Sequence, residues 1–226
     1  IMKTVILSLG GSMIVPKDVD YYYLREFKNF IIRLLDEGYK FVIVCGGGKT
    51  SSNYMYAANR VSENNNEDLD WIGVQSSRLN AELVRVIFGP LAYEKVVIDP
   101  SQKITTKKPI IVGAGWKPGW STDYVAVKLA EKLKADELVN LTNIDYVYTK
   151  DPNKFPDAKK VYETTWAKYR KMISSKWSPR LSTPFDPIAS ELAQKIKLKV
   201  AIINGKYLTH VSSYLKGETF DGTLIK

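Results

Sequence analysis

The fold is decided first by residues 4–12, Thr4-Val5-Ile6-Leu7-Ser8-Leu9-Gly10-Gly11-Ser12. This β-branched and apolar run is typical of a strand buried on both faces, and the glycine pair ends it. Apolar residues then recur at helical spacing over residues 23–35, before Gly38. A second buried strand at residues 40–45 ends at Gly46-Gly47-Gly48. The order strand, glycine turn, helix, repeated twice, predicts a parallel sheet covered by helices.

The same alternation continues along the rest of the chain. After a loop at residues 64–66, helical patterns are expected at residues 68–88, 121–133, 188–195 and 207–214. Short strands are expected at residues 95–98, 109–113, 137–141, 199–203 and 223–225. Residues 151–156 are predicted to be a polar loop bounded by proline, and residues 174–187 a second loop rich in serine, proline and tryptophan. Because no linker or internal repeat separates the two halves, we expect one domain over residues 1–226 with a shared sheet.

The composition is that of a globular protein, with 45% hydrophobic and 25% charged residues. No apolar run has the length of a membrane span, and a strand pattern rather than a signal peptide follows Met2, so we expect a cytoplasmic protein without membrane contact. A single cysteine, Cys45, excludes an internal disulfide and a multi-cysteine metal site. A single histidine, His210, argues against a catalytic triad or a zinc site. We assign no residue as a metal ligand.

The net charge of +9 is the feature that would suggest a nucleic-acid partner. No arginine-rich tract and no alternation of basic and aromatic residues is present, so we expect no nucleic-acid binding. Lysines such as Lys132 and Lys134 fall on the solvent face of a predicted helix. A positive surface would also steer a small polyanionic substrate.

Three glycine-rich turns, after residues 4–9, 40–45 and 109–113, each follow a strand and precede a helix. Such a turn directs backbone N–H groups and the positive end of a helix dipole at a bound anion. Neither the P-loop pattern nor the dinucleotide fingerprint is present. Glycines in turns also serve backbone geometry alone. Their shared position at the strand ends favours phosphate binding.

Five motifs, in this order, resemble those of the amino acid kinase family: SLGGS at 8–12, CGGGKT at 45–50, DWIGVQ at 70–75, PGWSTD at 118–123 and TNIDYVYTKDP at 142–152. Within that family, RLNA at 78–81 and the chain length are similar to the archaeal-type UMP kinases. The resemblance covers essentially the whole chain. It implies a three-layer α/β/α sandwich with a mostly parallel sheet, whose half before residue 136 holds the acceptor and whose other half holds ATP. It also implies transfer of the γ-phosphoryl of ATP to UMP with Mg²⁺, and a homohexamer built from dimers.

The resemblance assigns roles to individual residues, and positioning and electrostatics are expected to carry phosphoryl transfer. Lys49 and Asp123 are the expected catalytic residues, with Asp123 organising the catalytic lysine or magnesium. The expected UMP-binding residues are Gly47, Asp70, Trp116, Lys117, Pro118, Gly119, Trp120, Ser121 and Thr122. The expected ATP-binding residues are Gly10, Gly11, Ser12, Gly48, Ser52, Thr142, Asn143, Tyr148 and Asp151.

Some of these residues have a second interpretation. Asp70 also fits a charge placed at the N-terminus of a helix, and Ser121 fits an ordinary helix cap. Trp116 and Trp120 suit either stacking on a base or a contact between subunits. Tyr21, Tyr22 and Tyr23 are candidate subunit contacts, because aromatic residues are enriched at interfaces.

The chain departs from the family pattern at two positions of positive charge. Ser8 stands where many members carry a lysine, and Ser52 stands where most carry an arginine. Lys49 and Lys117 are the nearest replacements in the sequence. The loss of both charges favours an alternative, a non-catalytic or storage-type nucleotide-binding protein of the same fold. Asp70 and the pair Arg78 and Asn80 argue against it. A related small-molecule kinase with another acceptor is the third possibility.

Overall fold

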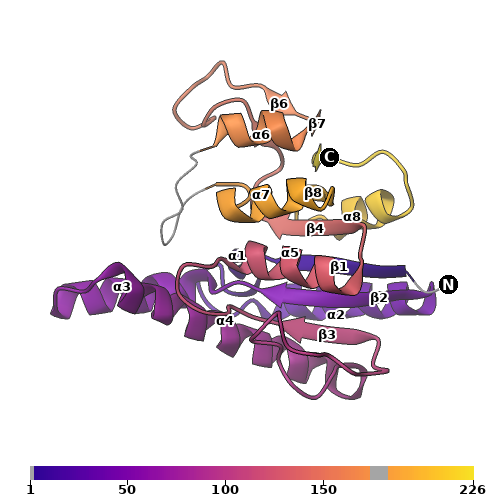
Figure 1. Ribbon diagram of the computed structural model, residues 1–226, viewed down its shortest axis with the longest axis horizontal. Coiled ribbons are helices and arrows are strands. Elements are labelled where there is room, and N and C mark those ends of the chain that lie inside the picture. The colour runs from indigo at the N-terminus through magenta and orange to yellow at the C-terminus, as the bar shows by residue number, and fades with distance from the viewer. Residues whose placement is uncertain (1–2, 174–182) are drawn as a thin grey trace.

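A seven-stranded sheet in the order β3-β2-β1-β4-β8-β9-β7 organises the computed structural model (Figure 1), which describes residues 3–173 and 183–226. All neighbouring strands are parallel except the pair β8 and β9. The expected mostly parallel sheet is confirmed. Its strands are β1 (Lys3–Leu9), β2 (Tyr39–Cys45), β3 (Ile110–Gly113), β4 (Glu137–Thr142), β7 (Glu163–Thr164), β8 (Lys199–Asn204) and β9 (Thr223–Ile225).

Helices cover both faces of the sheet and complete the three expected layers. Successive side chains of a strand point to opposite faces, so Leu7 of β1 joins one apolar cluster and Ile6 joins the other. The Leu7 cluster contains Phe27 of α2 (Tyr21–Asp36) and Val84 of α4 (Asn66–Phe88). The Ile6 cluster contains side chains of α5 (Thr122–Leu133), α6 (Trp166–Met172) and α7 (Pro187–Lys195). Each fully buried side chain of this kind contributes about 1.5–3 kcal/mol.

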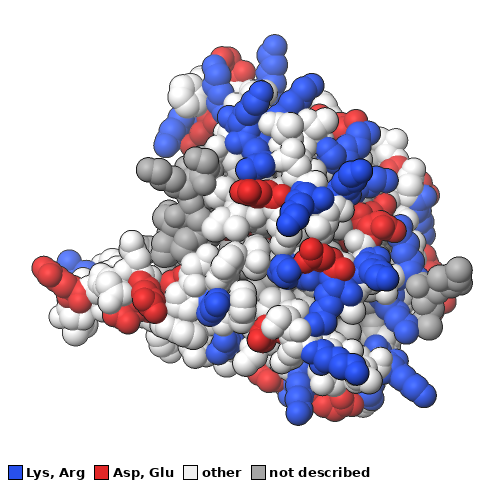
Figure 2. All heavy atoms as spheres, in the orientation of Figure 1, with Lys and Arg blue, Asp and Glu red and all other residues white. Residues whose placement is uncertain are grey.

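The remaining elements are short or lie at the margins of the sheet. They are α1 (Gly11–Ile14), α3 (Gly48–Val61), the 3₁₀ helix η1 (Gly89–Leu91), α8 (Leu208–Leu215) and a hairpin of β5 (Val147–Tyr148) with β6 (Lys160–Val161). Helix α3 extends beyond the rest of the chain in Figure 1. Figure 2 shows lysine and arginine side chains spread over much of this face of the molecule.

Capping side chains explain where the main helices begin. The carboxylate of Asp20 accepts a hydrogen bond from the Tyr23 N–H, and the Asn65 amide oxygen accepts one from the Asp68 N–H. These contacts satisfy N–H groups that have no partner inside the helix. Because Asn65 caps α4, that helix begins two residues before the expected start, at Asn66.

Several expectations about elements were wrong or incomplete. Residues 95–98 form no strand, because Val97 makes only an isolated bridge to Gly113. The hairpin β5–β6, strand β7 and helix α6 were not expected, since two-residue strands and a seven-residue helix carry too little periodicity. The loop at residues 151–156 is confirmed, whereas most of the loop expected at 174–187 lies outside the described residues. Of the three tyrosines, Tyr21 and Tyr22 are exposed, while Tyr23 packs against Phe27.

None of the helices in the described ranges combines the length and the apolar character that crossing a membrane requires.

Candidate active site

The first two glycine turns lie against each other, because β1 and β2 are parallel neighbours whose ends are in register at Leu9 and Cys45. A Cβ atom on Gly11 would lie 2.0 Å from the Gly48 nitrogen. A Cβ atom on Gly48 would lie 2.3 Å from the Gly11 oxygen, and Gly48 has a φ of +61°. The two turns therefore pack backbone to backbone, which only glycine permits at these positions. The backbone interpretation of these glycines is correct, and it is compatible with phosphate binding.

The N–H groups of the two turns fall into two sets. Gly10 donates to the Leu141 carbonyl oxygen at 2.9 Å and Gly46 donates to the Leu9 carbonyl oxygen at 3.0 Å, so both are engaged. The N–H groups of Gly11, Ser12, Gly47 and Gly48 donate to no acceptor within the ranges that the structure describes. They lie at the first turns of α1 and α3, where unpaired N–H groups and the helix dipole favour an anion.

A cavity of about 310 Å³, which we call the glycine-loop cavity, opens beside Gly47 and Gly48. Residues from the start of α3, the first half of α4, the start of α5 and the segment before α7 line it. Eight of the expected site residues line it, namely Gly47, Gly48, Ser52, Asp70, Trp120, Ser121, Thr122 and Asp123. The lining residues that the sequence did not identify are Ser51, Met55, Gly73, Val74, Ser77, Gly115, Thr183 and Asp186.

Helix α4 holds the loop at residues 114–121 against this cavity. The Asp70 carboxylate accepts a hydrogen bond from the Gly119 N–H at 2.6 Å, and the Ser77 hydroxyl accepts one from the Gly115 N–H at 2.8 Å. The Arg78 guanidinium donates to the carbonyl oxygens of Gly115, at 3.2 Å, and Trp116, at 2.6 Å. Burial raises the pKa of Asp70, and the hydrogen bond from Gly119 opposes that rise. Asp70 therefore meets the loop expected to bind the acceptor. It lies beyond the first turn of α4, which disfavours a helix-dipole role.

Asn80, further along α4, supports the second glycine turn. Its amide nitrogen donates to the carbonyl oxygens of Gly46 at 2.8 Å and Gly47 at 3.1 Å. Residues 78–81 were noticed in the sequence only for their similarity to a subfamily. Their contacts could not be foreseen, because both loops are far away along the chain.

Asp123 and Asp186 form an acidic centre at the wall of the cavity. The Ser8 hydroxyl donates to Asp123 Oδ1 at 3.0 Å, and the Asp186 N–H donates to Asp123 Oδ2 at 3.3 Å. Burial, followed by repulsion from the Asp186 carboxylate, raises the pKa of Asp123 to about 7, and the hydrogen bonds from Ser8 and Asp186 oppose this. Burial also raises the pKa of Asp186. The Asp186-Pro187 pair signals a helix start in the sequence, but nothing there indicates contact with Asp123.

A second cavity, of about 560 Å³, lies beside the β5–β6 hairpin, and we call it the hairpin cavity. The four expected ATP-binding residues of the C-terminal half, Thr142, Asn143, Tyr148 and Asp151, all line it. Thr183 lines both cavities, so they are adjacent. A two-substrate site divided between the halves of the chain is consistent with this arrangement.

The other expected residues do not line either cavity. Gly10, Gly11 and Ser12 form the turn that packs against Gly46–Gly48, and the Lys49 side chain is exposed at the start of α3. The Lys117 ammonium lies 4.2 Å from the centre of the Trp116 ring. Pro118 and Gly119 belong to the loop held by Asp70.

Ser121, which does line the glycine-loop cavity, also caps α5 by accepting a hydrogen bond from the Tyr124 N–H. Both interpretations of this residue therefore hold.

Comparison with known proteins agrees with this architecture. The sequence profile of the amino acid kinase family matches residues 3–204. The chain is 33% identical to a uridylate kinase of Methanocaldococcus jannaschii, over 98% of this chain and 99% of the relative, and 34% identical to that of Sulfolobus acidocaldarius, over 89% and 90%. The crystal structure of uridylate kinase from Archaeoglobus fulgidus superposes with a TM-score of 0.82 at 30% identity, covering 98% of this chain and 99% of that one. The chain belongs to the amino acid kinase family.

Proposed function

We propose that the protein transfers the γ-phosphoryl group of ATP to UMP in the presence of Mg²⁺, giving UDP and ADP for pyrimidine nucleotide synthesis. The relatives named uridylate kinase, which match nearly the whole chain, support this acceptor. We further propose that it acts in the cytoplasm as a homohexamer, for which the exposed Tyr21 and Tyr22 are candidate contacts. The observation that carries the proposal is the placement of Asp70 and the loop at 114–121 on one cavity with the glycine turns.

The geometry supports the assignment of one substrate to each of the two cavities. UMP would occupy the glycine-loop cavity, where the Asp70 carboxylate can accept hydrogen bonds from ribose hydroxyls. The base and ribose of ATP would occupy the hairpin cavity near Tyr148 and Asp151. The phosphates would then meet near Thr183, with the N–H groups of Gly47 and Gly48 directed at them. Such preorganised N–H groups stabilise the negative charge that develops during transfer.

The source of positive charge is the unusual part of this site. Ser8 and Ser52 are neutral, and the lining of the glycine-loop cavity contains no lysine, arginine or histidine among the described residues. Lys49 would have to turn its side chain toward the cavity to reach a phosphoryl group, because the structure places it in solvent. Its catalytic role and that of Lys117 stay predictions. Equal losses in kcat and kcat/KM on Lys49→Ala would support that role for Lys49.

UMP should be phosphorylated faster than CMP, AMP or GMP. A coupled assay of ADP release, run with each nucleoside monophosphate, ATP and Mg²⁺, measures this directly. Turnover with an isoprenoid phosphate or an acylated amino acid, and none with UMP, would assign a different acceptor. ATP binding by calorimetry without release of ADP for any acceptor would support the storage-type alternative.

Asp70→Ala should raise the KM for UMP about ten- to a hundredfold and leave the KM for ATP nearly unchanged, because Asp70 lines only the glycine-loop cavity. Losing a hydrogen bond to a charged group costs about 1.5–3 kcal/mol. Steady-state kinetics with each substrate varied in turn gives both constants. Glu67→Ala, at an exposed carboxylate in the first turn of the same helix, is the matched control and should behave as wild type. Equal weakening of both substrates would instead give Asp70 a purely structural role.

A further inference from the structure

We propose that Tyr169 is a positioning residue for phosphoryl transfer, although its own side chain lines neither substrate cavity. Its hydroxyl holds residues 183–186, which we call the shared wall because they line the glycine-loop cavity on one side and the hairpin cavity on the other. The inference rests on the proposed function for the reaction, whereas the effect of Tyr169 on the wall can be measured without substrate.

The shared wall lies where the two substrates are expected to meet. Thr183 lines both cavities, Pro184 lines the hairpin cavity and Asp186 lines the glycine-loop cavity. If ATP and the acceptor occupy these cavities, their phosphates approach each other along this segment. The position of the wall therefore helps to set the distance and the angle between the reacting groups, and both strongly affect the rate of transfer.

A single hydroxyl holds the middle of the wall through both backbone groups of Phe185. The Tyr169 hydroxyl accepts a hydrogen bond from the Phe185 N–H at 2.7 Å and donates one to the Phe185 carbonyl oxygen at 2.9 Å. Both residues are fully buried, so water cannot take over either bond. Burial raises the pKa of Tyr169, which keeps the phenol protonated and able to donate as well as accept. The Thr183 hydroxyl donates to the same carbonyl oxygen at 3.2 Å, which links Phe185 to the residue that lines both cavities.

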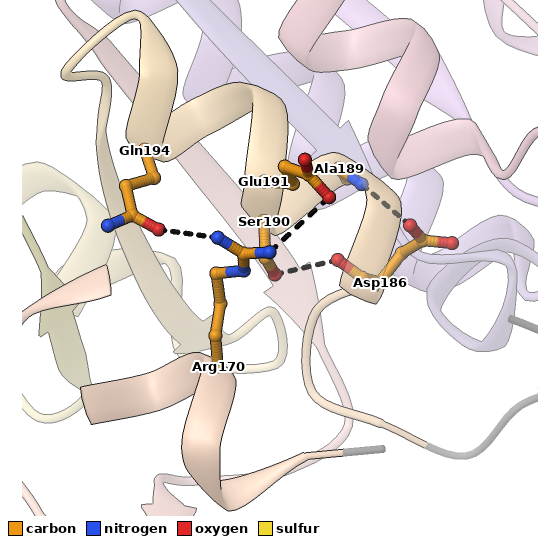
Figure 3. A network of polar contacts seen from close by, with 6 residues as sticks. All are labelled: Arg170, Asp186, Ala189, Ser190, Glu191 and Gln194. Atoms are coloured by element: carbon orange, nitrogen blue, oxygen red, sulfur yellow. Dashed lines mark hydrogen bonds and ion pairs between the residues drawn. The ribbon is translucent and has the colours of Figure 1, made fainter. Parts of the chain in front are cut away.

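The residues on either side of this point are held as well. The Asn140 amide nitrogen, on β4, donates to the Pro184 carbonyl oxygen at 3.0 Å. Asp186 begins helix α7, because its Oδ1 accepts a hydrogen bond from the Ala189 N–H at 2.7 Å and its carbonyl oxygen accepts one from the Ser190 hydroxyl at 2.6 Å (Figure 3). A displacement in the middle of the wall would therefore be passed directly to the start of α7.

A second connection between α6 and α7 lies at the surface and is the weaker one. Figure 3 shows Arg170 of α6 directed at Glu191 and Gln194 of α7, at 3.3 Å and 2.8 Å. The side chains of Arg170 and Glu191 are 39% and 70% exposed, and an exposed ion pair contributes little. An unpaired buried N–H group, in contrast, is costly. The buried Tyr169 hydroxyl is therefore the contact through which α6 positions the wall.

Tyr169→Phe removes this hydroxyl and keeps the ring in its apolar cluster. We expect kcat to fall about ten- to a hundredfold, because the phosphates lose their alignment. The KM values for ATP and UMP should change less than about threefold, since the proposed contacts of Asp70 and Tyr148 with the two nucleosides are unaltered. The coupled assay of ADP release, with each substrate varied in turn, gives all three constants.

Tyr39→Phe is the matched control, because it makes the same substitution at a hydroxyl that also donates to a backbone carbonyl. The Tyr39 hydroxyl donates to the Leu215 carbonyl oxygen at 3.2 Å, and neither residue lines a substrate cavity. This variant should keep the kcat and both KM values of wild type. Hydrogen exchange followed by mass spectrometry gives the readout without substrate. A peptide that contains Phe185 should exchange faster in Tyr169→Phe than in wild type or Tyr39→Phe.

Asn140→Ala releases the neighbouring Pro184 carbonyl oxygen and should lower kcat in the same pattern. It carries the test if circular dichroism and thermal melting show that Tyr169→Phe is not folded. A kcat of the folded variant equal to that of wild type, or unchanged hydrogen exchange at Phe185, would overturn the inference. A fall in both KM values with the loss of kcat absent would do the same, since it would assign Tyr169 no part in alignment.

These outcomes are separate from those that decide the proposed function. UMP turnover with equal kcat in wild type and Tyr169→Phe refutes only this inference. Turnover of another acceptor by wild type, and none of UMP, refutes only the proposed acceptor, and the same comparison of kcat is then made with the acceptor that is used. If wild type turns over no acceptor, the proposed function is refuted and the hydrogen-exchange comparison decides whether Tyr169 holds the wall.

Discussion

Gly48→Ala should lower the free energy of unfolding by about 2–5 kcal/mol and abolish nucleotide binding. Gly48 has a φ of +61°, a backbone conformation that costs a residue with a Cβ atom about 1–2 kcal/mol. The new Cβ atom would also lie 2.3 Å from the Gly11 carbonyl oxygen, and overpacking of this kind costs about 1–3 kcal/mol. The clash is between two backbones, so no side chain can turn aside to relieve it. Urea unfolding and ATP calorimetry measure the two effects.

Gly119→Ala separates the clash from the backbone strain. Gly119 has a φ of +86°, but no atom of the described residues lies within 4 Å of the position of an added Cβ. Backbone strain alone should therefore lower the free energy of unfolding of this variant, by about 1–2 kcal/mol. Gly11→Ala provides the complementary case, a clash without a positive φ, since its Cβ atom would lie 2.0 Å from the Gly48 nitrogen. If Gly48→Ala were no less stable than Gly119→Ala, the close packing of the two turns would not matter energetically.

Asp123→Asn should stabilise the metal-free protein at pH 8 by about 2–4 kcal/mol. The pKa of Asp123 is about 7 in the folded protein and 3.8 is its ordinary value, so the folded state retains a proton that the unfolded state loses. Wild-type stability should therefore be highest below about pH 4, fall as the pH rises to about 7, and stay constant above it. Each unit of pKa difference corresponds to about 1.36 kcal/mol, and we expect less than the full sum because solvent still reaches part of the side chain. The asparagine amide carries no charge, so the part of this pH dependence that comes from Asp123 should disappear, while a smaller part due to Asp70 and Asp186, whose pKa values burial also raises, should remain.

The measurement is urea unfolding between pH 4 and pH 8 in the presence of EDTA, which keeps divalent cations away from the carboxylates. Glu131→Gln serves as the control, since a surface ion pair such as Glu131 with Lys128 contributes little to stability. Its curve should keep the wild-type shape. A pH dependence as steep in Asp123→Asn as in wild type would show that another group retains the proton.

The alternation of apolar strands, glycine turns and helices predicted most of the fold, because a buried parallel strand and an amphipathic helix each leave a periodic pattern. Residues 4–9 and 68–88 are examples. The same reasoning failed at residues 95–98, where a short apolar run makes only one bridge, and it missed the two-residue strands of the β5–β6 hairpin. Elements this short owe their structure to neighbouring strands and not to local pattern.

The candidate site was predicted unevenly for a related reason. Asp70, Asp123, Thr142 and Tyr148 belong to compact motifs, and all four line a cavity. Asp186 was missed because its local sequence is explained by capping α7. Lys49 was expected at the reaction centre from its place beside Gly48, but helix geometry turns its side chain to solvent. Proximity along the chain does not determine the direction of a side chain.

The sequence by itself determined the sheet, its helical layers, the family resemblance and the position of the glycine turns at the strand ends. Those properties follow from patterns among residues that are close together in the sequence, so they can be recognised without the tertiary structure. Only the tertiary structure brought Ser8, Asp123 and Asp186 together and placed Arg78 and Asn80 under two separate loops. These contacts join residues 33 to 115 positions apart. They exist because parallel strands carry distant turns to the same edge of the sheet, where the packing of helices α4, α5 and α7 decides which side chains meet.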